Sequence, residues 1–140
     1  MSTPSTITVS LEWAKKLKEA GWPQSEPLHY WHRNVGQWYV YAKDFSEHDF
    51  NMVDGANFPA DVAAPTAEEI LRRLPYEIMD EGEAFELVIA PRRHGGWNVF
   101  YTHENGENRC AALEKEDSLA NAAAAMWVYL KEHDLLPSDK

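Results

Sequence analysis

The six histidines are the first residues to consider as a metal or acid–base site. His29 and His32 are three positions apart in a segment that favours a strand, so their side chains point to opposite faces and cannot easily share a metal ion. His94 follows two arginines, whose positive charge opposes the binding of a cation. His103 precedes a glutamate, but no second histidine follows at the spacing of a metalloprotease helix. The histidines are therefore interpreted as ordinary surface or packing residues.

The single cysteine and the common catalytic motifs give no active site either. Cys110 has no second cysteine to pair with, which excludes an internal disulfide and a cysteine-rich zinc site. Residues 49–55 place acidic and amide side chains near a glycine, but at the wrong spacing for a calcium loop. The sequence contains no glycine-rich phosphate loop and no serine-nucleophile motif. It therefore predicts no catalytic residue, no metal and no cofactor, and an enzyme is the least favoured class.

Aromatic rings and arginines are more informative, because these residue types anchor many binding surfaces. They are concentrated in two segments that favour strands, and helices on one face of a sheet would leave some rings exposed on the other. Either the long acidic connection covers those rings or they form a platform for a ligand, a partner or a second copy of the chain. The candidate binding residues are Trp31, Arg33, Trp38, Tyr39, Tyr41, Arg92, Arg93, Trp97 and Tyr101.

The formal net charge of −10 is concentrated in the middle of the chain. Residues 44–83 carry eleven acidic and two basic side chains. This segment is either a solvated acidic surface or a patch that docks a basic partner. The overall balance disfavours generic nucleic-acid binding, since DNA and RNA backbones are anionic. No apolar run approaches the ~18 residues of a membrane span, and the N-terminus lacks the pattern of a secretory signal.

Helix-capping residues and alternating apolar residues predict three helices and four strands. Ser10 and Gly21 would begin and end the first helix, Thr66 would cap the second, and Ser118 or Asp117 the third. The predicted helices span Leu11–Ala20, about 67–74 and about Leu119–Asp134, and the predicted strands span Leu28–Arg33, Trp38–Lys43, Ala84–Ala90 and Trp97–Thr102. Residues 1–8 are expected to be a flexible tail and residues 44–65 a long structured loop. Residues 77–82 and 103–116 are interpreted as turn and polar connection, with Asn105-Gly106 as a turn.

These elements predict a single α+β domain over residues 1–140, in the order αββαββα. The two hairpins are expected to join into one four-stranded antiparallel sheet, packed on one face by the three helices.

Four strings in the chain resemble a family of small, functionally uncharacterised proteins encoded in bacteriophage and prophage genomes. They are VSLEWAKKLKEAGWPQ, APTAEEILRRLP, GWNVFYT and SLANAAAAMWVYLKE. The resemblance touches most of the chain and leaves residues 44–64 and 103–116 uncovered. It implies an accessory protein of phage type that acts in a host cytoplasm, and it brings no catalytic residues.

The leading functional hypothesis is a non-enzymatic interaction module that binds a host or phage protein and forms a homodimer on its aromatic strands. The alternative is a small-ligand protein that binds or sequesters a nucleotide-like molecule. In that case the tryptophan and tyrosine rings would stack on a base, while Arg92 and Arg93 would hold phosphate. The single cysteine and the absence of a secretory signal favour a cytoplasmic protein.

Overall fold

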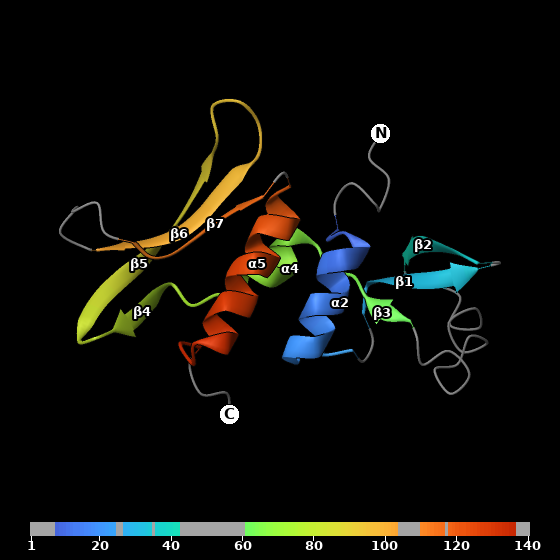
Figure 1. The fold of residues 1–140 in the computed structure, drawn as a ribbon, viewed down its shortest axis with the longest axis horizontal. Coiled ribbons are helices and arrows are strands. Elements are labelled where there is room, and N and C mark those ends of the chain that lie inside the picture. Colours follow the sequence, from blue (N-terminus) through green and yellow to red (C-terminus); the bar gives the residue numbers. More distant parts are fainter. Residues whose placement is uncertain are drawn as a thin grey trace. The chain divides into compact units, whose positions relative to one another are not determined.

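The computed structural model describes residues 8–24, 27–34, 36–42, 61–103, 110–116 and 118–136 (Figure 1). The chain divides into two compact units, Met1–Thr66 and Ala67–Lys140, and each contains its own sheet. The expectation of a single domain stays a prediction. Residues 1–7 of the predicted tail, most of the predicted long loop and the Asn105-Gly106 turn lie outside the described residues.

The first unit begins with helix α2 (Leu11–Ala20), whose bounds agree with the sequence prediction. The Ser10 side chain accepts a hydrogen bond from the Trp13 backbone N–H, which satisfies a donor at the start of the helix. At the other end Gly21 has a φ of 107°, in the left-handed region that glycine adopts without strain. The backbone N–H of Trp22 donates to Leu17 O over 2.9 Å, which completes the expected C-terminal cap.

An antiparallel sheet with the strand order β2-β1-β3 completes the first unit. Strands β1 (His29–Asn34) and β2 (Gln37–Ala42) form the predicted hairpin, each within one residue of the predicted bounds. Strand β3 (Val62–Ala63) lies within the segment predicted as a loop and pairs with β1. Thr8, expected in a flexible tail, is instead buried and bridges to Thr66.

The second unit contains two helices and an antiparallel sheet of four strands in the order β4-β5-β6-β7. Each strand follows its neighbour along the chain, so the sheet is a simple meander. The helices are α4 (Ala67–Leu71) and α5 (Leu119–Glu132), and the strands are β4 (Glu77–Asp80), β5 (Glu83–Pro91), β6 (Trp97–His103) and β7 (Cys110–Glu116). Helix α4 is shorter than predicted, because residues 72–74 form turns.

The α+β class and the three helices are confirmed, but the single four-stranded sheet built from two hairpins is wrong. The β1–β2 and β5–β6 hairpins belong to different sheets. The second hairpin is extended by β4 and β7, which the sequence analysis assigned to turn and polar connection. Both added strands are at edges of the sheet and rich in residues with low strand propensity, so pairing with the hairpin overrides their local preference.

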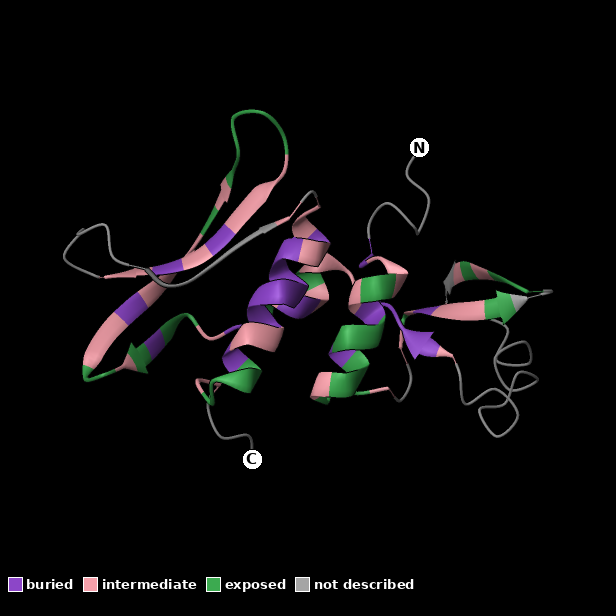
Figure 2. Ribbon diagram, in the orientation of Figure 1, coloured by how far each residue is buried: buried purple, intermediate pink, exposed green. Residues whose placement is uncertain are grey.

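The core of the second unit is arranged around α5 (Figure 2). This helix contacts α4, β6 and β7. Its buried residues include four consecutive alanines, Ala122 to Ala125. Small side chains allow the backbone of the helix to approach its neighbours closely, as the sequence predicted. Among the described residues, none of the helices combines the length and apolarity needed to cross a bilayer.

Candidate functional site

The nine candidate binding residues are divided between the two units. Five are on the β1–β2 hairpin and four are on β6 or the loop between β5 and β6. A single aromatic platform on one sheet, which was one of the two alternatives for these rings, is therefore not formed. The side chain of Tyr41 lies outside the described part of the chain.

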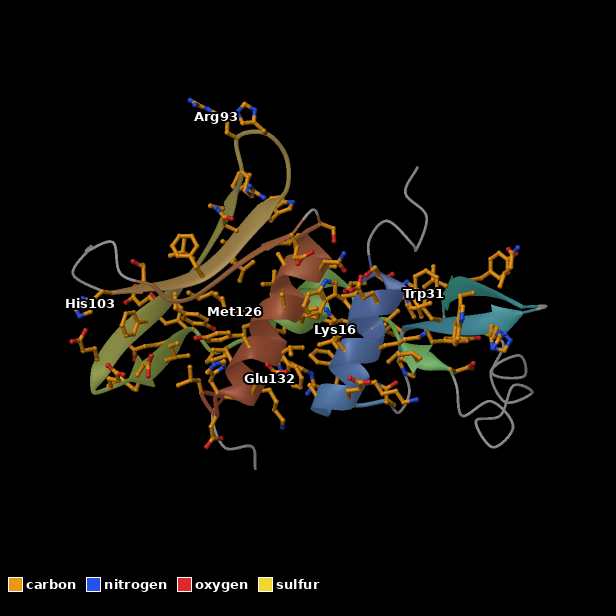
Figure 3. All side chains as sticks on the ribbon, in the orientation of Figure 1. Lys16, Trp31, Arg93, His103, Met126 and Glu132 are labelled. Carbon is orange, nitrogen blue, oxygen red and sulfur yellow. The ribbon has the colours of Figure 1, made fainter. Side chains whose placement is uncertain are left out.

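In the first unit, Trp31 (Figure 3) and Trp38 are on one face of the sheet and make contacts at or near α2. Trp31 and Trp38 share this face, because Trp31 pairs with Val40 and Trp38 pairs with Arg33. The Trp31 indole N–H donates to Val9 O over 3.2 Å, just before α2 begins. Lys15 Nζ of α2 lies 5.2 Å from the centre of the Trp38 ring. Both rings thus contact their own unit.

Among the candidate rings of this hairpin whose side chains are described, Tyr39 is the most exposed. Its side chain is on the opposite face from Trp38, and the residue is 46% exposed. The Tyr39 hydroxyl donates to Gln37 Oε1 over 2.9 Å. Arg33 is exposed near the end of β1.

Two polar contacts in this unit join residues that are distant in sequence. His32 Nδ1 lies 2.8 Å from Asp61 Oδ1, and both side chains are largely buried. Gln24 Oε1 accepts a hydrogen bond from the Ala63 backbone N–H over 2.9 Å. These contacts fix the segment around β3 against β1 and the end of α2. The sequence gives no local indication of either pair, because the partners are 29 and 39 residues apart.

In the second unit, Tyr101 is a core residue, and the expectation that it forms part of an exposed platform is wrong. It is 0% exposed, and its hydroxyl donates to Pro75 O over 2.7 Å. Burial raises the pKa of the Tyr101 phenol above its usual range, because the phenolate would lose its hydration. The sequence pattern placed Tyr101 on a strand but could not show which face would be covered.

Arg92 and Arg93 are exposed in the loop between β5 and β6, near the hairpin tip where the sequence placed them (Figure 3). Trp97 begins β6 directly after this loop, pairs with Pro91 and is half-buried. Of the four candidate binding residues in this unit, these three lie close together in sequence and are at least partly exposed. The nucleotide-like ligand stays a prediction.

Acidic side chains gather on the hairpin of β4 and β5, most of them from the acidic segment 44–83. We call this hairpin the acidic ribbon, with Glu77, Asp80, Glu81, Glu83 and Glu86 as its carboxylates. Glu77 lies directly opposite Glu86, and Asp80 directly opposite Glu83. Like charges at opposed positions of an antiparallel pair destabilise the pair by about 0.2–1 kcal/mol. The acidic residues of the ribbon therefore lower the stability of the β4–β5 pair.

The turn at the tip of the ribbon is a second feature that lowers the stability of the fold. Glu81 and Gly82 connect the two strands, and both have positive φ, 53° and 82°. Positive φ at both central residues is typical of a type I′ turn, for which Asn-Gly is strongly preferred. A glutamate in this position adopts the left-handed region that favours glycine and asparagine.

One ribbon carboxylate has a basic neighbour within the sheet. His103 Nε2 lies 3.2 Å from Glu83 Oε1, and the His103 ring meets Phe85 edge-on with centroids 5.7 Å apart. Tyr76, just before the ribbon, is 70% exposed, and Met79 within it is 59% exposed. Among the described residues, no group of three or more histidine, cysteine, aspartate or glutamate side chains is arranged to hold a metal ion.

Replacing Glu81 by asparagine is expected to stabilise the protein. The change gives the Asn-Gly pair that a type I′ turn prefers and removes one of three clustered charges, for a gain of about 0.5–1 kcal/mol. Urea unfolding followed by circular dichroism measures the free energy of unfolding. Glu81→Gln is the control, because it removes the charge without relieving the backbone. An Asn variant no more stable than the Gln variant would contradict the turn argument.

Comparison with known proteins assigns no family to the chain. No protein-family model, no curated protein and no solved structure matches it. The resemblance to phage and prophage proteins stays a prediction.

Proposed function

We propose that this chain is a non-enzymatic protein-interaction module that binds a basic segment of a host or phage protein. The binding surface is the tip of the acidic ribbon, which consists of Asp80, Glu81 and Glu83. The resemblance to phage and prophage proteins supports a partner of host or phage origin.

The observation that carries this proposal is Glu81 in the left-handed conformation, between two opposed carboxylates. Two features of this turn lower the stability of the fold: a glutamate with positive φ and a pair of opposed carboxylates. Both add negative charge to the tip. Backbone strain and like charges held close together persist in proteins mainly where binding or catalysis uses them. Carboxylates pair with lysine and arginine side chains, so a basic protein segment is the partner that the chemistry of the tip fits best.

The surroundings of the tip indicate what the partner would contribute. Tyr76 precedes β4 on the same side of the strand as Asp80, and its ring is largely exposed. One lysine or arginine of the partner could pair with the tip carboxylates, while a second long side chain of the same segment packs its aliphatic part on this ring. Charge contacts of this kind accelerate association and weaken as salt is added.

The test is capture of interacting proteins from a lysate of the source cells, quantified by mass spectrometry. Asp80→Asn combined with Glu81→Asn removes two tip charges and is expected to reduce capture of a basic partner at least about tenfold at low salt. Glu12→Gln combined with Glu68→Gln is the matched control. It removes two charges from exposed carboxylates that pair with Lys16 and Arg72 on their own helices.

The control variant should capture the partner as the unmodified protein does. If both variants captured less of the partner to the same extent, binding would depend only on the net charge of the protein, and the proposal would be overturned. The absence of any protein whose capture depends on the tip would also overturn it.

A further inference from the structure

The sheet of the second unit has two unlike faces. The buried side chains of its central strands, Phe85, Val99 and Tyr101, share one face, and α5 contacts this sheet through β6 and β7. Val88 and Phe100 are directly opposite each other on the other face, and both are only partly buried. We call this second side the open face.

The centre of the open face is apolar. Val88 of β5 and Phe100 of β6 form an apolar row across the two central strands. On β4, Met79 lies on the same face by alternation and is 59% exposed. An open apolar row in the middle of a sheet face is typical of a surface that packs against a second layer.

The two ends of this face carry opposite charge. Glu77 and Glu86 share the open face at the acidic end of β5, and Arg92 and Arg93 follow its other end. Six residues of β5 separate Glu86 from Arg92, a distance of about 20 Å, which is more than two Debye lengths at physiological salt. The two charge groups therefore cannot neutralise each other within one unit.

We infer that the open face binds the open face of a second copy of this chain, with the strands of the two sheets antiparallel. A two-fold axis along the apolar row would place the acidic end of each sheet over the basic end of the other. The same contact then forms twice, and the assembly closes as a dimer. Val88 and Phe100, which lie at the axis, would be buried between two sheets about 10 Å apart.

The size of the face indicates how strong the association is. Four strands about 4.8 Å apart and about 25 Å long give a planar area on the order of 500 Å² per partner. This is below the roughly 800 Å² per partner of a standard stable interface. The dimer is therefore expected to be weak and to depend on salt as well as on protein concentration.

This inference goes beyond the proposed function, because it uses the residues on the side of the ribbon away from Asp80 and Glu83. In an antiparallel ribbon, Glu77 and Glu86 point to the opposite side from that pair. A dimer on the open face therefore leaves the proposed partner surface accessible. Asp80→Asn combined with Glu81→Asn should leave self-association unchanged, which separates failure of one proposal from failure of the other.

Sedimentation velocity at about 5–300 µM protein tests the dimer over the range expected for a small interface. The full-length protein should form dimers at about 0.01 M salt, where the Debye length is about 30 Å, and fewer at about 1 M salt, where it is about 3 Å. Val88→Glu places like charges near the two-fold axis and should weaken the dimer at least about tenfold. Val88→Thr retains the branched shape and is the milder control.

Two charge-reversal variants test whether the open face binds a second copy of the chain. One variant carries Arg92→Glu with Arg93→Glu, and the other carries Glu77→Lys with Glu86→Lys. Each alone would place like charges together at both ends of the dimer and should remain monomeric. An equimolar mixture restores both attractive ends and should form a heterodimer about as strong as the original.

Rescue by mixing requires that the face binds a second copy, so neither a different protein nor the first unit of the same chain would reproduce it. A full-length protein that stays monomeric across the whole concentration range at low salt would overturn the inference. So would a mixture that associates no better than either variant alone, provided that circular dichroism shows both variants to be folded.

Discussion

Tyr101→Ala is expected to destabilise the second unit by about 3–5 kcal/mol, the loss typical of a large buried aromatic side chain. The ring is fully buried on the face of β6 that α5 covers, so its removal leaves a cavity lined by core residues. Its hydroxyl also donates to Pro75 O over 2.7 Å, and the carbonyl would lose this donor. Urea unfolding followed by circular dichroism measures the loss.

Tyr101→Phe separates the hydroxyl from the ring. It retains the aromatic packing and removes only the hydrogen bond to Pro75, so a loss of about 1 kcal/mol is expected at neutral pH. An alanine variant no less stable than the phenylalanine variant would show that the ring is not part of a packed core.

The same pair of proteins shows the effect of alkaline pH. Burial raises the pKa of the Tyr101 phenol above its usual range, so the folded protein retains this proton where the unfolded chain releases it. The stability of the unmodified protein should therefore fall as the pH rises past the ordinary tyrosine pKa of about 10. Tyr101→Phe should lack this part of the decline. Parallel pH profiles for the two proteins would contradict the assignment.

Local patterns were sufficient to predict the helices. Ser10 and Gly21 lie next to α2, and their capping hydrogen bonds span only three to five residues. The first and last residues of α2 therefore agree with the prediction. Helix α5 was predicted because its alanine-rich apolar face is continuous over several turns. The central hairpins were predicted for a comparable reason, since a strand pair joined by a short turn is itself a local structure.

The missed strands have weak patterns of their own. Strand β3 is two residues long, β4 has four residues of which two are acidic, and β7 is rich in alanine and glutamate. Each becomes a strand because a neighbouring strand offers backbone partners, which the local sequence does not show. Without β4 and β7, joining the two hairpins was the apparent route to a four-stranded sheet, and this produced the wrong topology.

The candidate site was predicted in part for the same physical reasons. Arg92 and Arg93 were placed correctly near a hairpin tip, because glycines and a short turn define that loop locally. Tyr101 was included among the exposed candidate residues, but it is buried. Its burial depends on which face of the sheet a helix distant in sequence covers. The acidic ribbon was not recognised as a hairpin. The dipeptide Glu81-Gly82 with acidic flanks was the local indication of its turn.

Ala123→Leu is expected to destabilise the protein by about 1–3 kcal/mol or more, although leucine is itself a good helix former. Ala122 to Ala125 are each no more than 2% exposed. Successive residues of a helix are about 100° apart, so these four point to all sides of α5. The helix therefore has no solvent-facing side at this level into which a larger side chain could extend.

Glu132→Leu is the matched control, since it inserts the same side chain at an exposed position near the end of the same helix. Its effect should stay within about 0.5 kcal/mol, as for most surface substitutions. Urea unfolding of both variants gives the comparison. If Ala123→Leu were as well tolerated as Glu132→Leu, the space around α5 would be loosely filled. The alanines would then reflect helix propensity alone and not the close approach of α5 to α4, β6 and β7.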